Sequence, residues 1–388
     1  MSVTLSRMVR ALAPSDIRTM SRACAAVDGI NLGQGICDLP THPLVQEGAI
    51  DAIRAGLATY SPYEGIPELR EAIARKMSSF NHLPCDPASE VVVTVGSTGA
   101  FAMAVFALCE PGDEVVLFEP FYGYHLNTLA AAGTKPVFVL LRGDRFEFDP
   151  RDLERAFERR PRAVVVCTPS NPCGKVFTRV ELSAIARLAA EHDVIALTDE
   201  IYEYILFDGA EHVSLATLPG MRERTVTISG LSKTFSITGW RLGYAVAPPE
   251  IARAITVLSD LFYVCAPTPL QYGGARGMTV EPEYYADLAR SYATKRALMA
   301  DSLRGAGMRP ILPQGAYYML ADVSALGWGD SRAAANRLLA ETGVASVPGA
   351  AFYHDGAGDG LLRFCFAKED DALLEAGRRM AALSTGRR

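Results

Sequence analysis

Several patterns that mark common classes of protein are missing from this chain of 388 residues. Its eight cysteines show no C-x-x-C spacing and its six histidines form no H-x-H or H-x-x-x-H pair, so the sequence predicts neither a disulfide framework nor a metal site. The net charge is −6 and no basic tract precedes the terminal Arg387-Arg388, which gives no reason to expect nucleic acid as a partner.

Long apolar runs are missing as well, because no stretch reaches the length of a membrane span or of a signal peptide. Hydrophobic residues make up 49% of the chain and charged residues 21%, a balance typical of soluble globular proteins. Unpaired cysteines in apolar contexts suit a cytosolic enzyme. We therefore expect a cytoplasmic protein that binds neither a membrane nor nucleic acid.

Short apolar runs bounded by turn residues dominate the middle of the chain. They show little alternation, which is typical of strands buried on both faces of a sheet. The predicted strands cover residues 91–95, 114–118, 136–141, 163–167, 194–197, 225–228 and 243–247. Helical patterns such as 100–108 and 180–190 lie between several of them. This order predicts an α/β fold whose large domain is a mostly parallel sheet flanked by helices.

The last hundred residues show a different pattern. A helical pattern over 283–305 suits a connecting helix, and shorter mixed segments with a final helix follow it. Because a chain of this length exceeds the usual size of one core, a second domain is expected. We predict a large domain over 46–285 and a smaller α/β domain formed by 1–45 and 286–388.

One loop of small residues carries a single lysine. Lys233 follows the predicted strand 225–228, and Arg241 lies eight residues further along. Open α/β sheets bind their ligands at such strand exits. A lysine placed there can form an imine with a carbonyl compound, although an ordinary surface lysine in a turn would produce the same pattern.

Other polar residues also follow predicted strands. The segment 96–100 leads into a helix, so its free N–H groups, with the hydroxyls of Ser97 and Thr98, suit a phosphate or simply an N-cap. Asp199 lies in an apolar setting, where a carboxylate needs a cation unless it caps a helix. Arg363 lies in an apolar strand-like run and needs an anion unless it faces outward.

Together these motifs resemble those of the class I/II aminotransferases, the fold type I enzymes that use pyridoxal 5'-phosphate (PLP). The resemblance covers nearly the whole chain and keeps the family's order. It implies the PLP-dependent transferase type I fold and an enzyme that moves an amino group from an amino acid to a 2-oxo acid by a ping-pong mechanism. The matching positions are Gly35, Tyr60, Ser97, Tyr122, Asn171, Asp199, Tyr202, Lys233, Arg241 and Arg363.

The resemblance also implies a role for each matching residue. Lys233 would carry PLP as a Schiff base and move the substrate proton, Asp199 would pair with the pyridine nitrogen, and Tyr202 would bond the phenolic oxygen. The implied cofactor contacts are Tyr60, Ser97, Thr98, Tyr122, Asn171, Asp199, Tyr202, Ser232, Lys233 and Arg241. The implied substrate contacts are Gly35, Asn171 and Arg363, with Arg363 on the α-carboxylate.

Some of these assignments have simple alternatives. Tyr122 matches the ring that stacks on the cofactor, but an isolated tyrosine is often a core residue. Gly35 matches a substrate contact, but its segment can also be a plain loop. In the family the residue at the position of Tyr60 reaches the phosphate in the neighbouring subunit, which implies a homodimer.

The sequence alone leaves two other functions open. A PLP-dependent β-lyase, which catalyses α,β-elimination, can use the same residues, and the fold can also serve as a regulatory ligand-binding domain. No DNA-binding segment precedes Asn31, which argues against the regulatory domain. The predicted loop 259–272 contains no Arg or Lys, and together with Tyr63 it offers aromatic residues, so a neutral or aromatic amino acid is favoured as substrate.

Overall fold

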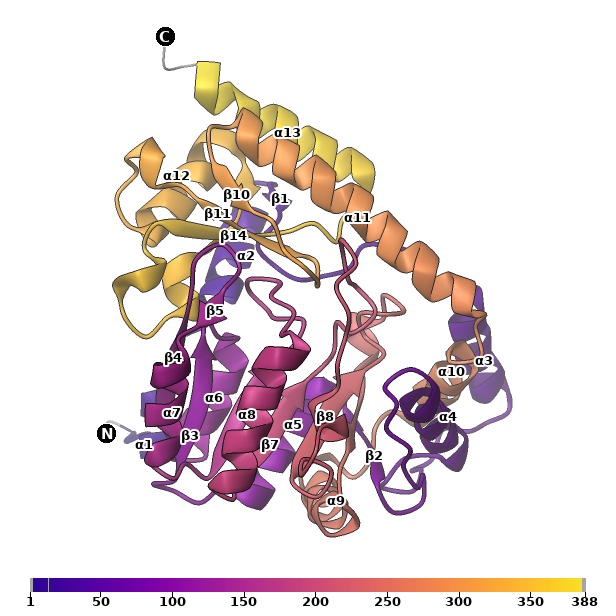
Figure 1. Cartoon of the computed structure of the whole chain (residues 1–388). Helices are drawn as coiled ribbons and strands as arrows, with labels where there is room; N and C mark the ends of the chain where they lie inside the picture. The colour runs from indigo at the N-terminus through magenta and orange to yellow at the C-terminus, as the bar shows by residue number, and fades with distance from the viewer. Residues whose placement is uncertain (1–2, 13, 386–388) are drawn as a thin grey trace.

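The computed structural model describes residues 3–12 and 14–385 of the chain. Its main feature is an eight-stranded sheet in the order β2-β9-β8-β7-β6-β3-β4-β5 (Figure 1). The strands are β2 (Val91–Val95), β3 (Glu114–Glu119), β4 (Lys135–Arg142), β5 (Glu147–Phe148), β6 (Ala163–Cys167), β7 (Ile195–Asp199), β8 (Thr225–Gly230) and β9 (Leu242–Val246). The neighbours β4, β3, β6, β7 and β8 run parallel, whereas β9 and β5 are antiparallel to the strands beside them. The predicted α/β fold with a mostly parallel sheet is confirmed.

Helices cover both faces of this sheet because each buried strand presents apolar side chains on both sides. In β6, Val164 and Val166 pack in one hydrophobic cluster, whereas Ala163 and Val165 pack in another on the opposite face. The first face is covered by α7 (Pro150–Glu158) and α8 (Arg179–Glu191), and the second by α5 (Gly96–Leu108), α6 (Gly123–Ala131) and α9 (Pro249–Tyr263). Beside β2 lie α3 (Pro43–Arg54), α4 (Pro67–Ser79) and α10 (Thr268–Gly277).

A second, smaller sheet lies above the first in the view of Figure 1. Its four antiparallel strands have the order β10-β11-β14-β13. They are β10 (Arg309–Ile311), β11 (Tyr318–Asp322), β13 (Val347–Pro348) and β14 (Leu361–Cys365), and α12 (Ser331–Thr342) and α13 (Asp370–Thr385) accompany them. The early segments α1 (Arg7–Ala11), α2 (Asp16–Ala26) and β1 (Ile30–Asn31) precede the large sheet, and β1 pairs in parallel with β12 (Val344–Ala345).

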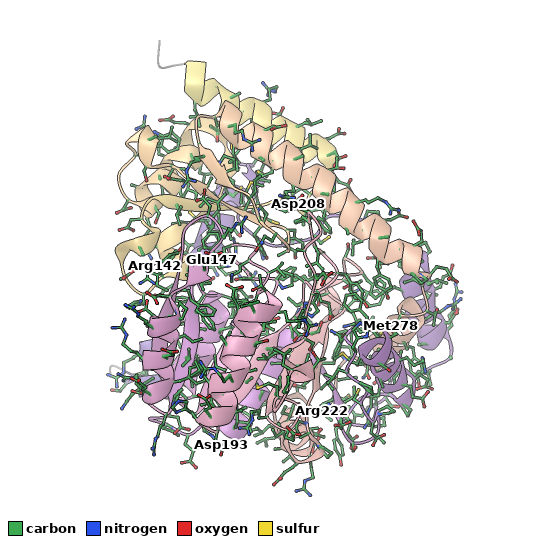
Figure 2. The ribbon with its side chains drawn as sticks, viewed as in Figure 1. Arg142, Glu147, Asp193, Asp208, Arg222 and Met278 are labelled. Atoms are coloured by element: carbon green, nitrogen blue, oxygen red, sulfur yellow. The ribbon has the colours of Figure 1, made fainter. Side chains whose placement is uncertain are left out.

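The predicted connecting helix is present as α11 (Pro282–Gly305), which runs beside α13 (Figure 1). Its Lys295 Nζ donates to the carbonyl oxygen of Lys368, at 2.7 Å. Its Arg296 forms an ion pair with Asp208, which lies beneath the helix and is labelled in Figure 2. The predicted domain boundaries after residues 45 and 285 fall inside α3 and α11, and the division into two domains stays a prediction.

The prediction of a loop over 259–272 is wrong. Its first five residues complete α9, and its last five begin α10. Pro269, near the start of α10, is suited to the first turn of a helix, where a missing N–H costs nothing. The helix α5 also begins earlier than predicted, at Gly96 rather than near residue 100. Over the described residues, no helix is both long enough and apolar enough to cross a membrane.

Candidate active site

The predicted site residues meet because of how the strands of the large sheet are oriented. The parallel strands β6, β7 and β8 end at one edge, and β2 runs in the same direction since both β2 and β8 are antiparallel to β9. Asp199 ends β7, Gly96 follows β2, and Lys233 lies three residues beyond β8. Arg241 reaches the same edge because it immediately precedes β9. This is the edge at which open α/β sheets bind ligands.

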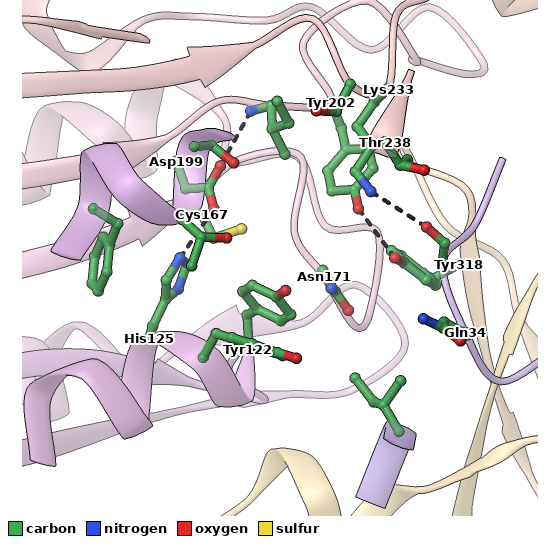
Figure 3. Close-up of a pocket in the computed structure, with 18 of the residues that line it drawn as sticks. Gln34, Tyr122, His125, Cys167, Asn171, Asp199, Tyr202, Lys233, Thr238 and Tyr318 are labelled. Carbon is green, nitrogen blue, oxygen red and sulfur yellow. Dashed lines mark hydrogen bonds and ion pairs between the residues drawn. The ribbon is translucent and has the colours of Figure 1, made fainter. Parts of the chain in front are cut away.

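A cavity of about 420 Å³ opens at this edge. Apart from Tyr60, every site residue predicted from the sequence lines it. The lining includes Gly35, Ser97, Thr98, Tyr122, Asn171, Asp199, Tyr202, Ser232, Lys233, Arg241 and Arg363. Residues that sequence reasoning did not single out also line it, among them Ile17, Arg18, Gln34, His125, Cys167 and Tyr318. Figure 3 shows how side chains from the large sheet, from α6 and from the loop that carries Gln34 converge on the cavity.

One end of the cavity has the donors that a phosphate group requires. The helix α5 begins there without any side-chain N-cap hydrogen bond; the N–H of Gly96 donates to the carbonyl oxygen of Arg241, and the N–H groups of Ser97 and Thr98 are available to an anion. Ser97 and Thr98 therefore do not act as the N-cap that was the alternative. A Cβ atom added at Gly96 would lie 2.3 Å from Nη2 of Arg241, so only glycine lets this guanidinium approach the helix start.

Asp199 is buried and is held by two hydrogen bonds. His125 Nε2 lies 3.0 Å from its Oδ2, and the backbone N–H of Ile201 donates to its Oδ1 at 3.3 Å (Figure 3). The His125 ring packs on Phe101, with 4.4 Å between ring centroids. Sequence reasoning missed His125 because it lies 74 positions from Asp199 in an ordinary helical segment. The pair fixes the direction in which the carboxylate faces the cavity.

Lys233 lines the cavity, and its amine lies close to the loop 32–36 that follows β1. Nζ donates to the carbonyl oxygen of Gly35 at 3.3 Å and lies 5.8 Å from the ring centroid of Tyr202. Burial lowers the pKa of Lys233 to about 8, against an opposing effect of the neighbouring thiols. Near neutral pH an appreciable fraction of the amine is therefore unprotonated, which is the form that attacks carbonyl carbon. The alternative of an ordinary surface lysine does not describe this environment.

Two tyrosines form the wall beside Lys233. The hydroxyl of Tyr202 donates to that of Tyr318 at 3.1 Å, and both rings are buried (Figure 3). Burial raises the pKa of Tyr202 well above its ordinary value and that of Tyr318 to about 12, so both hydroxyls stay protonated and can donate. Tyr318 also touches the segment 31–36, because a Cβ atom on Gly35 would lie 1.8 Å from its hydroxyl oxygen.

Arg363 is a fully buried cation that lines the cavity from β14. Nη1 donates to Asn171 Oδ1 at 2.7 Å, Nη2 donates to the carbonyl oxygen of Gly33, and the ring centroid of Tyr318 lies 4.2 Å away. Within the described residues it has no carboxylate partner, and its Nε lacks any hydrogen bond. The alternative of an outward-facing strand arginine is therefore excluded. A buried guanidinium without a counter-ion is an anion site.

Tyr60 is the predicted site residue that lies elsewhere. It is 80% exposed and does not line the cavity of its own chain.

Tyr122, in contrast, lines the cavity, and its ring meets the His125 ring edge-on, with 5.2 Å between the ring centroids.

Comparison with known proteins identifies the family. The model of the aminotransferase class I and II family matches residues 27–379. The chain is 37% identical over 393 residues to a probable N-succinyldiaminopimelate aminotransferase, DapC, of Mycobacterium tuberculosis, covering 98% of this chain and 99% of the relative. It is 36% identical over 371 residues to an aspartate aminotransferase of Pyrococcus abyssi, covering 95% of each. A solved structure of N-succinyldiaminopimelate aminotransferase from Mycobacterium tuberculosis matches with a TM-score of 0.95 at 37% identity, covering 98% of this chain and all of that one.

The chain therefore belongs to the class I and II aminotransferases. Members of this family are PLP-dependent enzymes of fold type I, and this chain is a PLP-dependent aminotransferase acting on amino acids and 2-oxo acids. The β-lyase alternative is not favoured. The cavity fits the cofactor, since the uncapped start of α5 suits its phosphate and the amine of Lys233 suits its aldehyde.

Proposed function

We propose that this cavity holds PLP and each substrate in turn, with Lys233, Asp199 and Tyr202 as the catalytic residues. The observation that carries this proposal is that the amine of Lys233 faces the same cavity as the carboxylate of Asp199. When bound, PLP supplies an electron sink for the negative charge that develops at the substrate Cα. The amine of Lys233 would accept the proton from the substrate Cα and later return it.

The other residues hold the reacting groups in place. Ser97, Thr98, Ser232 and Arg241 would bind the phosphate, while Tyr122 would pack on the ring and Asn171 and Tyr202 would donate to its phenolic oxygen. Asp199, oriented by His125, would keep the pyridine nitrogen protonated. Arg363 and Gly35 would contact the substrate, with the guanidinium on its α-carboxylate.

We propose a neutral or aromatic amino acid as the donor and a 2-oxo acid as the acceptor. The relatives named above act on a succinylated diamino acid and on aspartate, according to their names, so membership of the family leaves the donor open. Ile17 and Ile36 add apolar surface to the cavity, which supports a neutral side chain. A screen of amino acids for single-turnover reaction with the enzyme, in the absence of any acceptor, tests this choice directly.

Replacing Arg363 by alanine should raise KM for both the amino acid and the oxo acid, each by about a hundredfold. Charge-assisted bidentate hydrogen bonds are lost, and both carboxylates use the same site at different stages of the cycle. Steady-state kinetics with both substrates varied measures this paired effect. Arg309→Ala is the matched control, because Arg309 lies on the same small sheet in ion pairs with Asp144 and Asp322, outside the cavity. A KM increase for only one substrate would contradict the shared site.

We also propose that the enzyme is a homodimer with composite sites. Tyr60 is exposed and lies outside its own cavity, which supports a role in a neighbouring subunit. Exposed apolar side chains, Leu261 at 77% and Phe262 at 59%, end α9 nearby. The start of α10 joins them to the Tyr60 segment, since the hydroxyl of Thr268 donates to the carbonyl oxygen of Thr59 at 2.7 Å.

Mixing two inactive variants, Tyr60→Asp and Lys233→Ala, should restore activity in hybrid dimers. One of the two sites in each hybrid would combine an intact lysine with an intact tyrosine, so about a quarter of wild-type activity is the upper bound after random exchange. The measurement is turnover after unfolding and refolding the mixture, with each variant refolded alone as control. Light scattering that finds a fully active monomer would contradict the proposal.

We further propose a cytoplasmic location and a division into a large domain over 46–285 and a small domain formed by 1–45 and 286–388. All eight cysteines are free thiols, which supports a reducing compartment. The separate large and small sheets support the division. Limited proteolysis with mapping of the fragments tests the boundaries.

A further inference from the structure

Glu119 is a buried carboxylate to which the proposed function assigns no role. It ends β3, three residues before Tyr122, and it does not line the cavity. Both of its oxygens meet His354. Oε1 accepts a hydrogen bond from the backbone N–H of His354 at 2.6 Å, and Oε2 lies 2.7 Å from imidazole Nδ1. Removing a carboxylate from water costs free energy, which these two hydrogen bonds offset.

The pair connects the large sheet with the segment between β13 and β14 of the small sheet. Two other contacts lie beside it. The backbone N–H of Phe121 donates to the carbonyl oxygen of Phe352 at 2.9 Å. The imidazole ring of His354 stacks on Phe138 of β4, with 4.1 Å between ring centroids and 9° between the ring planes. The segment is therefore attached to the large sheet at three neighbouring points.

The same segment also contacts Arg363. The ring centroid of Phe352 lies 4.9 Å from the guanidinium carbon. A Cβ atom added at Gly349 would lie 2.2 Å from the carbonyl oxygen of Gly358 and 2.8 Å from Cβ of Leu361, so the segment packs tightly on the start of β14. A displacement of the segment would therefore move the guanidinium relative to the loop that follows β3.

We propose that His354 is a positioning residue for Arg363, and that by holding Glu119 it fixes the guanidinium relative to the cofactor-binding loop of the large sheet. The proposal rests on the proposed function, because it takes Arg363 as the site of the substrate α-carboxylate and Tyr122 as the residue that packs on the cofactor ring. His354 itself does not line the cavity. Its effect comes from alignment, since two parallel hydrogen bonds to a carboxylate require a correctly oriented guanidinium.

The informative variant is His354→Phe, which keeps a ring to stack on Phe138 and removes the donor to Glu119. We expect KM to rise about tenfold for both the amino acid and the oxo acid and kcat to fall less than about twofold, because binding weakens equally in the ground state and the transition state. The absorbance of bound cofactor should not change. Since His354 is exposed, the fold should tolerate the substitution, and His354→Leu gives the same comparison if the phenylalanine variant does not fold.

Two further variants separate positioning from a general loss of structure. His354→Asn, whose amide nitrogen can take the place of Nδ1, should restore most of the wild-type KM. The matched control is His192→Phe, because His192 lies at the end of α8, outside the cavity. That variant should keep the wild-type KM for both substrates.

A double-mutant cycle with Arg363→Ala gives the decisive readout. In the Arg363→Ala background, His354→Phe should leave KM unchanged, because a positioning residue has no effect once the group that it positions is missing. An unchanged KM in His354→Phe alone, a His354→Asn variant that is equally impaired, or the full effect in the Arg363→Ala background would overturn this inference and leave the proposed function intact. If Arg363→Ala itself leaves both KM values unchanged, the proposed role of Arg363 is refuted, and this inference with it.

Discussion

Lys233→Ala should reduce turnover by at least about a thousandfold, because in the proposed function one amine provides both the nucleophile and the general base. Reduction of the wild-type holoenzyme with borohydride should fix the cofactor to a single peptide that contains Lys233. The measurements are single-turnover kinetics and peptide mapping by mass spectrometry. Lys135→Ala is the control, since Lys135 is an exposed lysine of the same sheet. Label on another lysine would refute the assignment.

The lowered pKa of Lys233 adds a pH dependence to this experiment. Burial disfavours the ammonium form, so the neutral amine becomes the main form above pH about 8 rather than above the usual value near 10.5. In the apoenzyme, the rate at which Lys233 reacts with an amine-directed reagent should rise with pH and level off above pH about 8. A rate that still rises steeply at pH 10 would show an ordinary lysine.

Asp199→Asn should keep the cofactor bound and lower kcat by about a hundredfold to a thousandfold. The amide preserves the shape but removes the charge that, in the proposed function, holds a proton on the ring nitrogen, and such electrostatic stabilisation is commonly worth ~3 kcal/mol or more. The measurements are kcat and the absorbance of bound cofactor.

His125→Asn is the informative companion variant. It removes one of the two hydrogen bonds that orient the Asp199 carboxylate while leaving the charge, so its effect on kcat should be smaller than that of Asp199→Asn. Near-normal turnover in Asp199→Asn would show that this aspartate has only a structural role.

The sequence was sufficient to predict those features that depend on residues close together in the chain. Runs of apolar residues located the strands of the large sheet, and parallel strands place their carboxyl ends together, so residues such as Asp199 and Lys233 had to meet at one edge. The start of α5 was placed too late because Gly96 lowers helix propensity, whereas in the structure its N–H donates to the distant Arg241 carbonyl oxygen at 2.9 Å.

Contacts between distant segments could not be predicted in this way. His125 meets Asp199 from a helix whose sequence has no special feature, and Tyr318 reaches Tyr202 across 116 positions. Arg18 lines the cavity from α2, which packs against β13 of the small sheet across more than 300 positions. The segment 259–272 was misjudged because a short turn between two helices, with a proline near the start of the second, resembles a loop when read alone.

The hydrogen bond from Arg363 to the carbonyl oxygen of Gly33 joins residues 330 positions apart. Gly35, two residues further along, accepts a hydrogen bond from Lys233. The strand β1, just before these glycines, pairs with β12. During synthesis the strands of the large sheet are therefore all made well before the substrate site can form, because β14 must still leave the ribosome and close over a segment made 330 residues earlier. Contacts of such high sequence separation slow folding, because the entropy of loop closure opposes them. The growing polypeptide can thus fold most of its mass while it is still unable to react with the free amino acids that surround it.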